Sequence, residues 1–133
     1  MAERPATDGQ DGALNGARLL VVEDEFMILL ELESILLEAG AASVSLCGTL
    51  DKALEQIETE SFAAALLDMR VGRNDIAPVA RALDRHGIPF AFYTGQLAKD
   101  PVRAEWPDRP TISKPAPARL ITQTLAGLIE TQA

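Results

Sequence analysis

Short apolar runs alternate with helical patterns from residue 17 to the end of the chain. The run from Leu19 to Val22 has no polar alternation, which is typical of a strand covered on both faces. Further strands are predicted at Ser43 to Cys47, Phe62 to Leu67, Ile88 to Tyr93 and Thr111 to Ser113. Strands buried on both faces favour a parallel sheet.

Helical periodicity fills most of the intervals between these runs. Helices are predicted at Phe26 to Glu38, Leu50 to Glu58, Asp75 to Arg85 and Ala118 to Thr131. The interval 96–110 contains three prolines, so it is expected to hold only a short or disordered helix around Leu97 to Glu105. Because parallel strands need crossover connections, this order predicts an α/β domain with a five-stranded sheet covered on both faces.

The first residues of the chain have a different composition. Residues 1–16 carry Pro5, Gly9, Gly12 and Gly16 and almost nothing apolar, which predicts a flexible N-terminal tail before a folded domain over 17–133. The chain has neither the apolar core of a signal peptide nor a run long enough for a membrane span. We therefore expect a cytoplasmic protein without membrane contact. Because the chain ends soon after the last predicted helix, no output domain is expected to follow.

Composition narrows the function classes. The 133 residues suit one domain, and 12 basic against 20 acidic residues give a net charge of −8. This acidic balance argues against a nucleic-acid partner, which would need a basic surface for phosphates. A single cysteine, Cys47, excludes an intrachain disulfide and a CxxC metal site, and we interpret it as a small buried apolar residue.

Polar side chains stand where the predicted strands end. Glu23 and Asp24 follow the first strand, Asp68 the third, Thr94 the fourth and Lys114 the fifth. Ligands of open α/β sheets bind at the carboxyl ends of the strands, so these side chains are expected to converge. Three neighbouring carboxylates repel one another unless a cation lies among them, and Mg²⁺ prefers such hard oxygen ligands.

The same residues suit phosphoryl transfer. The three carboxylates, one Mg²⁺ ion and the Lys114 ammonium sum to a neutral site. Aspartate carboxylates act as nucleophiles that form acyl phosphates, and Asp68 is the candidate. The Thr94 hydroxyl could donate to a phosphoryl oxygen, while Lys114 would offset the charge that develops during transfer.

The segments Leu19 to Glu25, Ala65 to Met69, Tyr93 to Gly95 and Ser113 to Pro115 resemble the receiver domain of bacterial response regulators, over residues 17–131. The resemblance implies a flavodoxin/CheY-like (βα)5 fold with strand order 2-1-3-4-5. It further implies phosphorylation of Asp68 by a histidine kinase or a histidine phosphotransferase, with Thr94 and Lys114 holding the phosphoryl group. Glu23, Asp24, Asp68 and the backbone carbonyl of Arg70 would hold Mg²⁺, and the Lys114–Pro115 bond would be cis.

A finer resemblance lies in residues 89–95, which are similar to the PFxFATG signature of the alphaproteobacterial FAT GUY response regulators. That subfamily implies a sensor kinase of the HWE type. Tyr93 stands where the signature has alanine, and Gln96 where it usually has tyrosine. The wider family has an aromatic switch residue where this chain has Thr111. We therefore hypothesise that signalling runs through Thr94 and the segment 96–110.

Three functions compete. The leading hypothesis is a stand-alone receiver that is not itself an enzyme and signals to a downstream protein target by protein–protein contact. The second is a phosphatase of the haloacid dehalogenase type, but that chemistry needs an acid two residues after the nucleophile and this chain has Arg70. The third is a degenerate receiver that binds proteins without phosphorylation.

The helix predicted at Phe26 to Glu38 carries more apolar residues than one core-facing stripe needs. The surplus is either a surface for a partner or a homodimer, or a face that the N-terminal tail buries.

Overall fold

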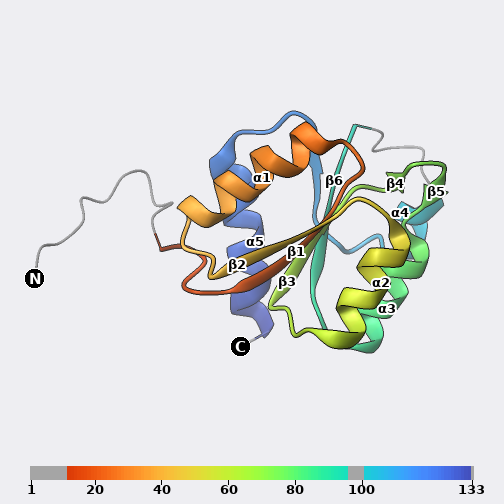
Figure 1. Ribbon diagram of the computed structural model, residues 1–133, viewed down its shortest axis with the longest axis horizontal. Coiled ribbons are helices and arrows are strands. Elements are labelled where there is room, and N and C mark those ends of the chain that lie inside the picture. The colour runs from red at the N-terminus through yellow and green to blue at the C-terminus, as the bar shows by residue number, and fades with distance from the viewer. Residues whose placement is uncertain (1–11, 96–100, 133) are drawn as a thin grey trace, which may run out of the picture.

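A central parallel sheet organises the protein in the computed structural model, which describes residues 12–95 and 101–132. Its five strands are β1 (Arg18–Val22), β2 (Ser43–Cys47), β3 (Ala64–Leu67), β6 (Phe90–Thr94) and β7 (Thr111–Ser113). They lie in the order β2-β1-β3-β6-β7 and pair in parallel (Figure 1). Counted within this sheet, the order is 2-1-3-4-5, so the predicted flavodoxin/CheY-like fold class is confirmed.

Helices cover both faces of the sheet. They are α1 (Phe26–Glu38), α2 (Leu50–Thr59), α3 (Ala77–Arg85), α4 (Pro101–Glu105) and α5 (Ala118–Gln132). α1 and α5 lie on one face and α2 and α3 on the other (Figure 1). Helix α4 has 5 residues, in line with the short helix expected there, although the predicted start at Leu97 falls in 96–100, outside the described residues.

Alternation along the strands divides the core into two layers. Leu19 and Val21 of β1 pack with the α1/α5 layer, whereas Leu20 and Val22 pack with the α2/α3 layer. Successive residues of β3 and β6 alternate in the same way. Because side chains alternate with period two, the residues just after each strand also point alternately toward the two layers.

Several predicted boundaries shift for local reasons. Strand β6 begins at Phe90 rather than Ile88, because Pro89 has no N–H to donate to a ladder. Helix α3 begins at Ala77 rather than Asp75, whose Oδ1 accepts the Ala77 N–H at 2.9 Å. Thr49 caps the N-terminus of α2, and its side-chain oxygen accepts the Lys52 N–H at 3.2 Å.

A short antiparallel hairpin follows β3 and was not expected from the sequence. It consists of β4 (Arg70–Val71) and β5 (Asn74–Asp75). The turn places Gly72 at φ +65, a conformation that glycine adopts without steric cost. The hairpin begins two residues after Asp68 and so lies beside the strand ends.

The segment 12–16 packs on the domain. Leu14 is 1% exposed, and its N–H donates to the Ala39 carbonyl at 3.0 Å. The Gly16 N–H donates to the Gly40 carbonyl at 2.8 Å, which ties the segment to the end of α1. Residues 1–11 lie outside the described residues, so the flexible tail stays a prediction for them. None of the described helices is both long and apolar enough to cross a membrane.

Candidate functional site

The sheet brings the predicted site residues to one edge. Backbone hydrogen bonds continue past the strand ends. The Glu23 N–H donates to Cys47 O at 3.0 Å and the Asp68 N–H to Val22 O at 3.0 Å. The Lys114 N–H donates to Thr94 O at 3.1 Å. These bonds hold the residues after β1, β3 and β7 in register with the last residues of β2, β1 and β6.

An open cavity of about 400 Å³ lies at this edge of the sheet. Its lining includes five of the six predicted site residues and two of their neighbours: Asp24, Glu25, Asp68, Arg70, Thr94, Gly95 and Lys114. Thr94 is the last residue of β6 and is 3% exposed. Glu23 is buried behind the cavity lining, and its Oε1 accepts a hydrogen bond from Lys114, which is part of that lining.

Lys114 joins two of the carboxylates. Its Nζ donates to Glu23 Oε1 at 2.7 Å and to Asp68 Oδ2 at 3.0 Å. Burial alone would lower the pKa of Lys114, but these two hydrogen bonds and the negative charges of the same carboxylates together outweigh it and raise that pKa above its ordinary value. The ammonium is therefore charged at neutral pH and lies directly beside the Asp68 carboxylate.

Glu23 is buried beneath the site, with 1% of its surface exposed. Its Oε2 accepts the Glu25 N–H at 3.1 Å, while Oε1 accepts from Lys114. Burial raises the pKa of the Glu23 carboxyl, and the nearby Asp68 charge adds to this, although both hydrogen bonds act in the opposite direction. Both oxygens are thus engaged by the protein itself.

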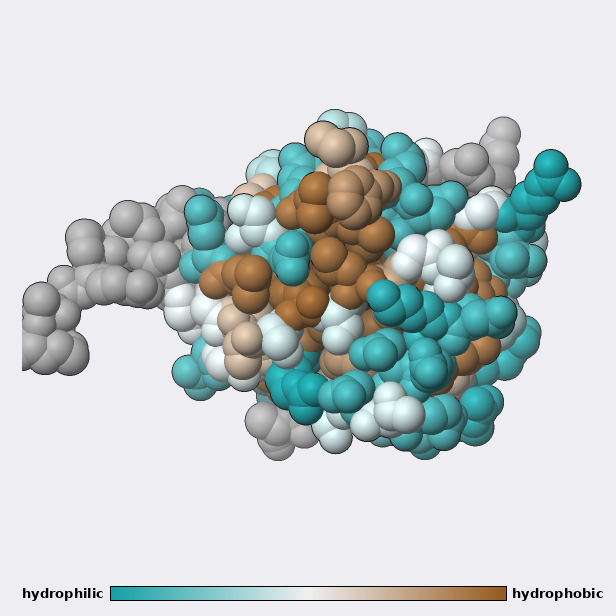
Figure 2. Space-filling view, viewed as in Figure 1, coloured by the Kyte–Doolittle hydropathy of each residue, from teal (hydrophilic) through white to brown (hydrophobic). Residues whose placement is uncertain are grey.

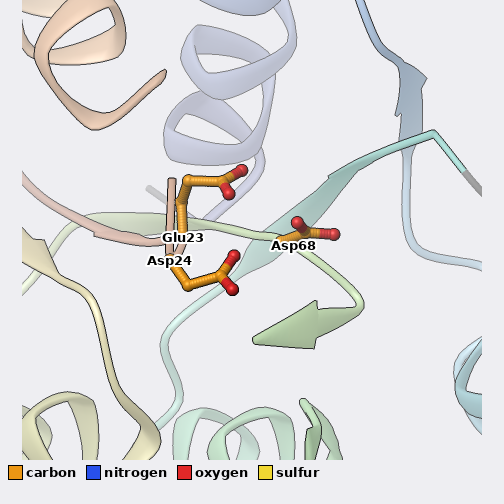
Figure 3. A group of neighbouring side chains, drawn as sticks. All are labelled: Glu23, Asp24 and Asp68. Atoms are coloured by element: carbon orange, nitrogen blue, oxygen red, sulfur yellow. The ribbon is translucent and has the colours of Figure 1, made fainter. Parts of the chain in front are cut away.

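The three carboxylates form a cluster that suits a cation. Glu23, Asp24 and Asp68 each offer one oxygen, and these oxygens lie within 4.8 Å of one another (Figure 3). The Asp24 Oδ2 accepts the Gly72 N–H at 2.9 Å, so the hairpin orients this side chain. Carboxylate oxygens at an open cavity are the donor set that Mg²⁺ prefers, and the residues present therefore fit this ion.

Two parts of the site were missed or underrated from the sequence. The hairpin amide that holds Asp24 was missed, although a Gly-Arg pair between two short segments is a recognisable turn signal. Spacing along the chain also does not predict the contact of the buried Tyr93 with Lys114, in which the Nζ atom lies 5.7 Å from the ring centroid. The Lys114–Pro115 bond is cis, as the resemblance implied. Cys47 is fully buried, as predicted, and burial raises the pKa of its thiol to about 11.

Thr111 is half-buried in β7 at the position of the family's aromatic switch. Its hydroxyl accepts from Arg103 Nη1 at 2.6 Å, which links β7 to α4. The hypothesis that signals pass through Thr94 and the segment 96–110 stays a prediction, since residues 96–100 are not among the described ones.

Helix α1 keeps a surplus of apolar side chains at the surface. Phe26 is 67% exposed and Met27 75%, with Leu30 at 40% and Leu37 at 44%. Figure 2 shows apolar residues gathered over α1 and along the neighbouring edge strand β2. Of the predicted tail, the described part buries Leu14 at the C-terminal end of α1 and leaves these four side chains exposed.

Comparison with known proteins supports the fold from a second direction. No family model matches the chain. No curated protein matches it either. Among solved structures, SdrG from Sphingomonas melonis Fr1 is 34% identical, with a TM-score of 0.73 over 85% of this chain and 96% of that one.

Two further neighbours carry the receiver name. A response regulator receiver protein from Sinorhizobium medicae WSM419 is 24% identical over 90% of this chain and 99% of that one, with a TM-score of 0.77. A CheY-like receiver domain protein from Methanospirillum hungatei JF-1 is also 24% identical, over 87% and 95%, with a TM-score of 0.78.

The fold thus has response regulator receiver domains among its structural neighbours. At its identity and coverage with SdrG, the chain belongs to the same family as that protein.

Proposed function

We propose that the protein is a phosphoacceptor receiver that takes a phosphoryl group on Asp68 and signals through protein–protein contact. The observation that carries the proposal is the placement of the Lys114 ammonium, 2.7 Å from Glu23 and 3.0 Å from Asp68, at the mouth of an acidic cavity. A positive charge fixed beside a nucleophilic carboxylate favours the attack of that carboxylate on an anionic phosphoryl group.

The chemistry follows from the side chains around the cavity. One oxygen of Asp68 attacks the phosphorus of a phosphohistidine, and the phosphorus–nitrogen bond breaks with its electron pair returning to the imidazole. Lys114 and the Thr94 hydroxyl, both in the cavity lining, face the incoming oxygens. Mg²⁺ held by Glu23, Asp24, Asp68 and the Arg70 carbonyl would neutralise charge on the transferred group.

The proposed donor is a histidine kinase, including the HWE type that the PFxFATG-like segment suggests, or a histidine phosphotransferase. A donor that reaches the cavity must also lie over the N-terminal end of α1, because Glu25 lines the cavity and Phe26 and Met27 come next. Their exposure supports α1 as part of the surface that binds the donor. A homodimer through α1 would use the same apolar residues.

Intact mass after incubation with Mg²⁺ and phosphoramidate tests the proposal. We expect one added phosphoryl group that hydroxylamine removes, because acyl phosphates react with this nucleophile, and no addition to Asp68→Asn. Glu60→Gln, which alters an exposed carboxylate far from the cavity, is the matched control and should be modified like the wild type. Failure to modify the wild type with excess donor and a fast quench would contradict the proposal and favour a phosphorylation-independent binding module.

A further inference from the structure

Tyr93 lies on the same face of the sheet as the charged pair of the site. It is the penultimate residue of β6 and is 5% exposed in the core layer under α1 and α5. Its partner across the ladder is Ile112 of β7. Lys114 follows Ile112 by two residues, so alternation directs its side chain to the face that Tyr93 occupies.

The ring of Tyr93 is the third neighbour of the Lys114 ammonium. The Nζ atom lies 5.7 Å from the ring centroid, within the range of about 6 Å over which a cation is attracted to an aromatic face. The other neighbours are the Glu23 and Asp68 carboxylates at 2.7 and 3.0 Å. The ammonium is thus bounded by two anions and by one aromatic ring that core packing fixes in place.

A lysine side chain is flexible, and holding its ammonium at one place costs rotamer entropy. The two carboxylates attract the charge without fixing the path of the four-carbon stem. A buried ring beside the ammonium limits the rotamers available to that stem and adds attraction of its own. We infer that Tyr93 is a positioning residue, which holds the Lys114 ammonium at Asp68 for phosphoryl transfer.

This inference rests on the proposed function and extends it to a residue at which the chain departs from the PFxFATG signature. When a phosphoryl group joins Asp68, the Lys114 ammonium must contact the new oxygens rather than turn wholly to Glu23. A ring that holds the ammonium near the carboxyl ends of the strands favours its contact with the new phosphoryl oxygens. An aliphatic side chain of similar size fills the core but supplies no such attraction.

Two variants distinguish the effect of the aromatic ring on Lys114 from its effect on core packing. Tyr93→Leu removes the aromatic face and keeps an apolar side chain, whereas Tyr93→Phe keeps the face and loses only the hydroxyl. We expect Tyr93→Leu to lower the initial rate of Asp68 phosphorylation by phosphoramidate about fivefold, a size typical of a partly desolvated cation–π contact. Tyr93→Phe should retain most of the wild-type rate, and Mg²⁺ affinity should change in neither variant.

A double-mutant cycle with Lys114→Met gives a readout that does not depend on phosphorylation. In urea unfolding, Tyr93→Leu should increase the unfolding constant of the protein by some factor in each background. We expect that factor to be about threefold larger in the wild-type background than in the Lys114→Met background. Equal factors would overturn the inference, because ring and ammonium would then not interact. Equal phosphorylation rates for the Leu and Phe variants would also overturn it.

The two proposals fail in different ways. A wild-type protein that takes no phosphoryl group contradicts the proposed function, and with it the role of Tyr93 in transfer, even where the unfolding cycle shows coupling. A phosphorylated wild type without coupling between Tyr93 and Lys114 contradicts only the inference about Tyr93.

Discussion

Thr122 of α5 is a buried polar residue whose hydroxyl has no hydrogen-bond partner in the described part of the chain. Its side chain is fully buried, and among the described residues nothing accepts or donates a hydrogen bond to its hydroxyl. A buried hydroxyl that lost its water and found no replacement destabilises the folded state. We expect Thr122→Val, which keeps the shape and removes the hydroxyl, to raise the free energy of unfolding by about 1 kcal/mol in urea titration.

The control for this substitution lies two residues further along the same helix. The Thr124 hydroxyl donates to the Leu120 carbonyl at 2.7 Å, so Thr124→Val removes a hydrogen bond that is made. It should leave stability unchanged or lower it. Equal effects at both positions would mean that a change common to both substitutions, such as helix propensity, rather than the unpaired hydroxyl, controls the result.

The residue types at the strand ends could be predicted from the sequence, but which of these side chains contact one another could not. The order of strands was enough to place Asp24, Asp68 and Lys114 at one edge. Spacing along the chain carries no information on which carboxylate Lys114 approaches, because that depends on side-chain packing across β1, β3 and β7. The engagement of both Glu23 oxygens is visible only in three dimensions.

At the scale of elements, residues 12–16 pack against the C-terminal end of α1 and hold it in place. Leu14 is buried there, and a Cβ on Gly40 would lie 2.9 Å from the Gly12 Cα, so the two segments pack closely. We expect Leu14→Ala to lower the free energy of unfolding by about 3 kcal/mol, the usual cost of a cavity at a buried leucine. Leu37→Ala, at a leucine 44% exposed, is the matched control and should cost about 0.5 kcal/mol or less.

Urea unfolding monitored by circular dichroism measures both variants. Similar losses at positions 14 and 37 would show that Leu14 is not part of the core in solution. The burial of Leu14 also explains why the predicted domain boundary at residue 16 is difficult to place from composition. One leucine among glycines and small polar residues gives no periodicity, so its burial leaves almost no trace in the sequence.

Elements of the main sheet and the helices that cover it were predicted well because each has a face to bury. The limits of α1, β2 and β7 agree with those expected from the apolar pattern. The hairpin β4–β5 has two residues in each strand, too few to show alternation. Its formation depends on Gly72 and on the contact with Asp24, and short elements of this kind are set by tertiary structure.

The exposed face of α1 leads to a second prediction at this scale. Met27 and Leu30 are exposed near the end of α1 that borders the cavity. A Met27→Lys substitution should slow phosphorylation by a protein donor about tenfold, as loss of an apolar contact at an interface does. It should leave phosphorylation by phosphoramidate unchanged, because a small donor does not touch α1.

Stopped-flow transfer from a phosphorylated histidine kinase, compared with mass spectrometry for phosphoramidate, measures the two rates. Glu38→Gln makes the same charge change of +1 at the far end of α1 and controls for electrostatic attraction alone. A Met27→Lys variant that is slow with both donors would indicate damage to the site rather than to a docking surface.

For the whole molecule, we expect the acidic cluster to couple stability to divalent cations. The three carboxylates repel one another across less than 5 Å, and Lys114 offsets only part of their charge. An ion that binds the folded state alone stabilises it by mass action, by about 1.4 kcal/mol at a concentration tenfold above its Kd. For a domain of this size, such a gain raises Tm by about 5 °C. We expect Mg²⁺ to produce this shift in differential scanning calorimetry and a chelator to reverse it.

The Asp24→Asn variant tests whether the response to Mg²⁺ comes from the acidic cluster. Removing one carboxylate relieves repulsion, so the variant should be more stable than the wild type without Mg²⁺, and it should lose most of the Mg²⁺ response. Glu31→Gln, on the exposed side of α1, should change neither value. A wild-type protein that gains nothing from Mg²⁺, or an Asp24→Asn variant that gains as much as the wild type, would contradict a metal site at this cluster. Because Asp68 belongs to the same cluster, the loss of that site would also remove the charge balance on which the proposed phosphorylation of Asp68 depends.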